Sequence, residues 1–150
     1  GRKTSPKVYA DKQKFPLGKG IVLREGTDIT LVSCGIMTAK ALQAADMLAN
    51  ENISAAVIDM FTVKPLDAEL LVSYAKKTGA VLTAENHNKI GGLYSACTDA
   101  LANKCPVPVG YVAVEDEFGE VGPQDYLEER FGLTSAHIVQ TARETFKRKK

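Results

Sequence analysis

Polar residues that could do chemistry follow directly on an apolar stretch near the middle of the chain. The apolar residues are 80–82, and the polar run after them contains Glu85, Asn86 and His87. A carboxylate beside an imidazole could exchange protons or orient a ligand. The chain has only two histidines and places no nucleophile near this run. We therefore favour hydrogen bonds to loop backbone, or pairing across an interface, over catalysis.

Two adjacent glycines, Gly91 and Gly92, stand just before a helix-like stretch. Backbone amides at such a point can approach an anion, and this predicted helix start is the best intrinsic anion site in the chain. Gly-Gly is not the G-x-G-x-x-G fingerprint of dinucleotide sites, however. A tight packing corner is the interpretation we favour.

A second polar group lies near residue 118. Asp116, Glu117 and Glu120 surround Phe118 and Gly119. A metal ion could bind carboxylates, but their spacing matches no calcium loop. We expect solvated carboxylates or an interface. No metal site is predicted anywhere in the chain.

The totals describe an ordinary globular domain. The chain has 150 residues, is 45% hydrophobic and 25% charged, and carries a net charge of +1. This length suits one domain with its own core. The charge gives no reason to expect nucleic acid, and no apolar run approaches the ~18 residues that would span a membrane. Three cysteines without metal-like spacing fit reduced thiols and a cytoplasmic location, with Cys34 a small core residue.

Strands and helices alternate along most of the chain. Apolar runs predict strands at 21–24, 29–34, 53–61, 80–84 and 107–114. The short turn at 25–28 indicates that the first two strands form an antiparallel hairpin. Helical spacing predicts helices over 38–51, 67–79, from 92 onward, over 124–131 and from 135 onward. Thr38, Asp67 and Ser135 are the predicted N-caps, and Gly79 should end the second helix.

This order predicts an α/β fold of three αβα layers. The sheet should have five strands, mostly parallel with one antiparallel strand, because strand-helix alternation implies right-handed crossovers. The carboxyl ends of parallel strands are where ligands or partners usually dock, so the polar groups above should gather at one edge.

Several sequence blocks resemble one family, the C-terminal domain of transketolase and related thiamine-diphosphate enzymes. The resemblance covers nearly the whole chain. Its blocks are Gly26–Gly35, Val57–Asp67, Glu85-Asn86-His87 with Gly91-Gly92, Phe118–Gly122, and Tyr126-Leu127 with Phe131-Gly132-Leu133.

The resemblance implies a role within a larger enzyme. The family transfers a two-carbon ketol unit between sugar phosphates, and thiamine diphosphate supplies the carbanion chemistry. Cofactor and Mg²⁺ would lie between a diphosphate-binding and a pyrimidine-binding domain, so neither is expected in this chain alone, which should be inactive by itself. Residues 1–20 would be a linker after a missing pyrimidine-binding domain, and residues 21–150 the C-terminal domain.

No catalytic residue carries over from the family. Arg2 matches an arginine that binds the substrate phosphate at the domain junction, and a guanidinium suits that group. The domain should support the site and contribute a homodimer contact. The residues expected to contact neighbouring domains, or to have accessory roles, are Glu85, His87, Gly91, Gly92, Phe118 and Glu120.

Two other interpretations stay open at this point. The chain could be the same domain of a deoxyxylulose-phosphate synthase or of a 2-oxoacid dehydrogenase β subunit. It could also be a stand-alone module that holds an anion or a regulatory nucleotide at Gly91 and Gly92.

Overall fold

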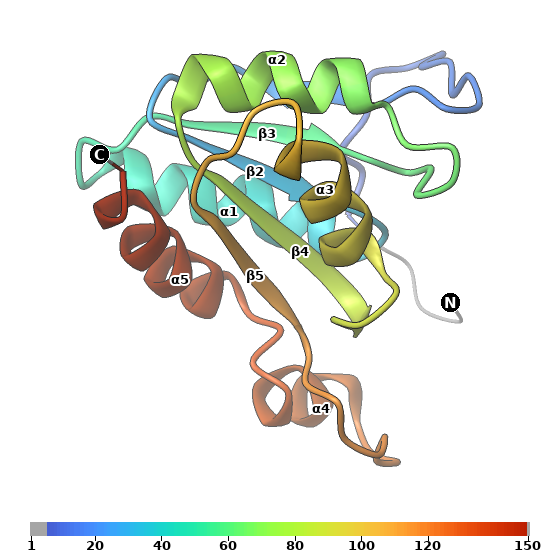
Figure 1. Ribbon diagram of the computed structural model, residues 1–150. Helices are drawn as coiled ribbons and strands as arrows, with labels where there is room; N and C mark the ends of the chain where they lie inside the picture. Colours follow the sequence, from blue (N-terminus) through green and yellow to red (C-terminus); the bar gives the residue numbers. More distant parts are fainter. Residues whose placement is uncertain (1–5, 150) are drawn as a thin grey trace.

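The computed structural model describes residues 6–149, and the structural statements below concern that part of the chain. A five-stranded sheet forms the centre, in the order β1-β3-β2-β4-β5, with helices on both faces (Figure 1). Strands β2 to β5 run parallel, and β1 is antiparallel to its neighbour β3. The predicted three-layer αβα fold with one antiparallel strand is confirmed.

The helices and strands follow one another in the predicted order. None of the described helices is long and apolar enough to cross a membrane. The strands are β1 (Ile21–Arg24), β2 (Ile29–Ser33), β3 (Ala55–Asp59), β4 (Val81–Asn88) and β5 (Val109–Val114). The helices are α1 (Met37–Ala49), α2 (Ala68–Thr78), α3 (Leu93–Ala102), α4 (Gln124–Arg130) and α5 (Ser135–Lys147).

Each face of the sheet has its own hydrophobic core. Leu31 and Val57 pack on one face with side chains of α1 and α5. Val32 and Ile58 pack on the other face with side chains of α2 and α3. Because both faces are covered, β2 and β3 are buried along their whole length, which explains their near-continuous apolar sequences.

The predicted hairpin between the first two strands is wrong. β1 lies at the edge of the sheet beside β3, while β2 lies between β3 and β4. The connecting turn crosses the start of β3, where a Cβ added at Gly26 would come within 2.1 Å of the backbone nitrogen of Ala56. A short connection predicts a hairpin only if the two strands are neighbours, and here β3 is inserted between them.

Two predicted helix signals on α2 are confirmed. The Asp67 carboxylate accepts a hydrogen bond from the backbone N–H of Leu70 at 3.2 Å and caps the helix. Gly79 ends it in the left-handed conformation, with φ of 71°.

Two other predicted caps are wrong. α1 begins at Met37 and ends at Ala49, and Thr38 lies inside its first turn, buried and hydrogen-bonded elsewhere. On α5 the cap is Thr134, whose hydroxyl accepts from the backbone of His137, one residue before the predicted Ser135. At α1 the N-cap position is Ile36, which makes no side-chain cap, and the Thr38 hydroxyl donates to Asp59 instead; at α5 the adjacent Thr134 takes the capping position.

Candidate functional site

The four parallel strands end along one edge of the sheet, and the predicted polar residues gather there. β2 and β3 end side by side, with Ser33 paired to Asp59. β4 is longer than predicted and continues to Asn88, so Glu85 and His87 lie on the strand rather than beyond it. The strand continues through these polar residues because β5 runs beside it, and Asn88 pairs with Val114.

Glu85 caps helix α3 from the neighbouring strand. Its side chain is 2% exposed, and its two oxygens accept hydrogen bonds from the backbone N–H groups of Leu93 at 2.7 Å and Tyr94 at 2.8 Å. These N–H groups have no partner within the helix, and the positive end of the helix dipole favours a carboxylate. The domain's own anion therefore occupies the anion site predicted at this helix start.

Gly92 makes this contact possible. A Cβ at Gly92 would lie 2.1 Å from Glu85 Oε2, far inside van der Waals contact. The expected packing corner thus has a specific cause, which is the close approach of the Glu85 carboxylate to the helix start. Gly91 has a φ of +78° and an open surrounding, so it serves the turn geometry instead.

His87 does not form a catalytic pair with Glu85. Its Nδ1 lies 3.9 Å from Glu85 Oε2, which is too long for a hydrogen bond. The same nitrogen lies 2.9 Å from the backbone oxygen of Asn88, and 66% of the His87 side chain is exposed. Glu85 is already bonded to the helix, and its contact with His87 is at most a long ion-pair contact.

A second buried carboxylate, Asp59, ends strand β3. It is fully buried and accepts hydrogen bonds from the hydroxyls of Thr38 at 3.1 Å and Tyr9 at 2.7 Å. Burial raises the pKa of Asp59, and the two hydroxyl bonds offset this only partly. Sequence reasoning assigns Asp59 no role. The available signal is an acidic residue at the end of an otherwise apolar run.

Tyr9 belongs to the segment predicted as a linker, and this segment packs on the domain. The ring of Phe15 stacks edge-to-face with Tyr9 at 4.8 Å and with Phe61 at 5.2 Å. Burial and the bond to Asp59 raise the pKa of Tyr9 to about 12, so its hydroxyl stays a neutral donor. Arg2, the predicted phosphate ligand, lies outside the described residues.

Cys34 and Cys97 are not reactive groups. Burial, with the charges of Glu85 and Asp59, raises the pKa of Cys34 to about 11. Burial raises the pKa of Cys97 to about 12. Both therefore remain neutral thiols near pH 7, in agreement with the predicted packing role of Cys34.

The acidic loop after β5 is held by arginine. Arg130 of α4 forms ion pairs with Glu117 at 2.9 Å and with Glu120 at 2.8 Å. Between these anchors Phe118 is 97% exposed, and Val121, just beyond them, is fully exposed. The loop therefore presents apolar side chains on a fixed support.

The described residues do not fit thiamine diphosphate or its metal ion. Within residues 6–149, no three His, Cys, Asp or Glu side chains are grouped to hold a metal. The helix start best suited to a diphosphate is capped by Glu85. No chemical step is therefore derived through the cofactor on this chain.

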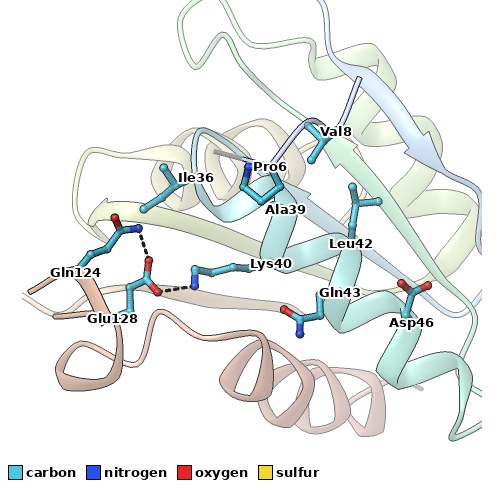
Figure 2. A pocket seen from close by; sticks show the side chains of 10 residues that line it. All are labelled: Pro6, Val8, Ile36, Ala39, Lys40, Leu42, Gln43, Asp46, Gln124 and Glu128. Atoms are coloured by element: carbon cyan, nitrogen blue, oxygen red, sulfur yellow. Dashed lines mark hydrogen bonds and ion pairs between the residues drawn. The ribbon is translucent and has the colours of Figure 1, made fainter. Parts of the chain in front are cut away.

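A cavity of about 480 Å³ lies between α1, α4 and the start of the linker (Figure 2). Pro6 and Val8 form one side of it. On the other side, Lys40 pairs with Glu128 at 2.7 Å, and Gln124 donates to the same carboxylate at 2.8 Å. Asp46, which also lines the cavity, forms an ion pair with Arg24, so the acidic side chains of the lining are already engaged by basic side chains of the chain itself.

The fold and this edge define a class of protein. It is a doubly wound α/β domain in which the Glu85 and Asp59 carboxylates at the polar edge are both bonded to groups of the chain itself. The family model for "Transketolase, C-terminal domain" matches residues 18–138. The chain belongs to this family.

Individual relatives agree with this assignment. The chain is 49% identical over 148 residues to the 6-deoxy-6-sulfo-D-fructose transketolase subunit of Clostridium sp. (strain MSTE9), covering 99% of this chain and 46% of that protein. It is 39% identical over 130 residues to the 1-deoxy-D-xylulose-5-phosphate synthase of Heliobacterium modesticaldum, covering 86% of this chain and 20% of that protein.

A solved structure described as "Split gene transketolase, inactive beta4 tetramer" superimposes with a TM-score of 0.96 at 49% identity. That match covers all of this chain and 49% of the solved one. Transketolase from Leishmania mexicana shares the fold, with a TM-score of 0.66 at 21% identity, over 87% of this chain and 18% of that one. The chain thus spans about half the length, or less, of the relatives it matches.

Proposed function

We propose that this chain is the C-terminal support domain of a thiamine-diphosphate-dependent transketolase that transfers a two-carbon ketol unit between anionic sugars. The single observation that carries the proposal is the 49% identity over 99% of the chain to a transketolase subunit. Cofactor and Mg²⁺ would bind in diphosphate-binding and pyrimidine-binding domains outside this chain. The domain would act in the cytoplasm.

The geometry of the sheet edge supports this division of labour. Glu85 and Asp59, the buried carboxylates at this edge, are both hydrogen-bonded to groups of the chain itself. A general acid or base must reach a proton of the substrate, and neither group is placed to do so. This geometry favours a supporting role, in which Arg2 would bind the phosphate or sulfonate of the sugar from the domain junction.

A graft tests the proposal. This chain would replace the matching half of the Clostridium subunit, and ketol transfer would be measured with the rest of that enzyme present. We expect activity from the graft and none from the 150 residues alone. Titration calorimetry of the chain alone with thiamine diphosphate and Mg²⁺ should give no heat. Tight saturable binding would place the cofactor contacts within these residues and overturn the division of labour.

The loop around Phe118 is the surface we assign to assembly. Its exposed apolar side chains and its Arg130 anchor support a contact with a neighbouring domain or a second copy, and the related split-gene transketolase forms a tetramer. In the graft, replacing Phe118 and Val121 by Ser should weaken assembly in sedimentation experiments. Met47→Ser, at an exposed apolar position on α1, is the matched control. Equal effects of both changes would refute the assignment.

A deoxyxylulose-phosphate synthase domain is the second candidate. Several such enzymes are 38–40% identical to most of this chain. The substrate distinguishes the two functions, because a synthase would use a 2-oxoacid donor. A graft that is active with pyruvate and inactive with ketose donors would favour the synthase.

A further inference from the structure

The strand order creates a crevice at the carboxyl edge. β3 lies on one side of β2 and β4 on the other, so α1 after β2 and α3 after β4 cover opposite faces of the sheet. In open α/β sheets, ligands bind at such a reversal of strand order. Gly35, just after β2, and Asn86 of β4 face each other here, since a Cβ on Gly35 would lie 3.7 Å from Asn86 Oδ1.

The linker lies against this position. A cavity of about 250 Å³ beside Gly35 is lined by Pro6, Val8 and Tyr9 of the linker, together with Ile36 and Ala39 at the start of α1. From there the Tyr9 side chain continues to the end of β3 and donates to Asp59. The place where a related fold would hold a ligand is therefore covered by the chain itself.

We propose that residues 6–20 form a strap, and that Tyr9 and Asp59 are positioning residues that fix the strap and so orient the domain preceding it. The proposal rests on the proposed function, because it requires such a domain. Tyr9 and Asp59 act through this placement and do not touch the substrate.

Two anchors hold the strap. At one end, Tyr9 donates to a buried carboxylate at 2.7 Å, and the ring of Phe15 packs against both Tyr9 and Phe61. At the other end, the backbone N–H of Gly20 donates to Asp67 at 3.1 Å. Hydrogen bonds to carboxylates are stronger than neutral ones, and Asp59 faces no cation among the described residues, so Tyr9 is its principal donor together with Thr38.

Limited proteolysis of the 150-residue chain tests the anchor. Lys12 and Lys14 are exposed trypsin sites between the two anchors, and cleavage follows the population of the opened strap. We expect Tyr9→Phe and Asp59→Asn to raise the cleavage rate there about tenfold. Tyr74→Phe is the matched control, because it removes a 2.6 Å hydroxyl bond to Glu25 on another surface. Rates within twofold of the wild type in Tyr9→Phe, or an equal rise in Tyr74→Phe, would overturn the proposal.

Kinetics of the grafted enzyme test the positioning role. With the strap loosened by Tyr9→Phe, the KM for the sugar substrate should rise severalfold while kcat stays within twofold, since the strap leads to the predicted phosphate ligand Arg2. An active graft whose KM is unchanged by Tyr9→Phe would refute positioning. An inactive wild-type graft would instead refute the proposed function, and the proteolysis result would still decide whether the strap is anchored.

Discussion

The two buried carboxylates at the sheet edge make different use of the same chemical group. Asp59 ends β3 and Glu85 lies on β4, on opposite sides of β2, and the two side chains are almost equally buried, at 0% and 2% exposure. Glu85 accepts hydrogen bonds from two backbone N–H groups at the positive end of a helix, whereas Asp59 accepts hydrogen bonds from two hydroxyls. The first arrangement fastens a helix to the sheet, and the second fastens the linker to the domain. The donors supplied by the surrounding structure thus decide what a buried carboxylate holds.

Removing Glu85 should have the largest effect on stability. Glu85→Ala leaves two N–H groups of a buried helix start without acceptors, and it removes the charge that complements the helix dipole. We expect a loss of about 3 kcal/mol in the free energy of unfolding, measured by urea titration. Glu69→Ala, at an exposed position in the first turn of α2, should cost less than about 0.5 kcal/mol. A loss below about 1 kcal/mol in Glu85→Ala would show that the cap contributes little.

Gly92→Ala should disrupt the same contact between Glu85 and the start of α3, here by a change in the helix. The new Cβ would lie 2.1 Å from Glu85 Oε2, so the carboxylate would have to leave its place. We expect a loss of about 2 kcal/mol in thermal or urea unfolding. Gly119→Ala, whose Cβ would meet nothing within 4 Å, should be nearly neutral. If both substitutions cost the same, close packing at Gly92 is not the cause.

The pH dependence of the free energy of unfolding should reveal the raised pKa of Asp59. Burial raises its pKa in the folded protein, so the folded state favours the protonated form. The stabilisation from this group is therefore fully present below the ordinary carboxyl pKa of about 4, and it is lost as pH rises through the raised value. As pH rises above about 4, wild-type stability should fall relative to Asp59→Asn in urea titrations. A constant difference across that range would contradict the raised pKa.

The smallest expected effect is on the pKa of Cys34. Burial raises this pKa most, and the charges of Glu85 and Asp59 raise it further, so the thiol reports on both carboxylates. The charge of Glu85 contributes more than that of Asp59. In a background with Cys97 and Cys105 replaced by Ala, the Cys34 pKa of about 11 should fall in Glu85→Gln and fall less in Asp59→Asn. The pH dependence of iodoacetamide alkylation measures this. The opposite order would mean that Asp59 dominates the field at the thiol.

Much of the candidate site is visible in the sequence as residue types but not as contacts. Glu85, Gly91 and Gly92 mark a polar corner at a helix start, and a packing role of the glycines is the interpretation that the sequence favours. That Glu85 itself fills the anion site does not follow from the sequence, because the seven residues between Glu85 and Leu93 can form many loops. The contacts of His87, Phe118 and Glu120 with neighbouring domains stay predictions.

The sequence by itself determined the elements of this protein and their order. Periodicity marks which faces are buried, and the signals at Asp67 and Gly79 act on backbone groups within four residues, so they do not depend on the rest of the fold. The tertiary structure alone decided that β1 pairs with β3, and that Tyr9 reaches Asp59 across 50 residues of sequence. Such pairings depend on which strands lie side by side. Several strand orders can bury the same apolar faces, and the choice between them is made by packing of the whole chain.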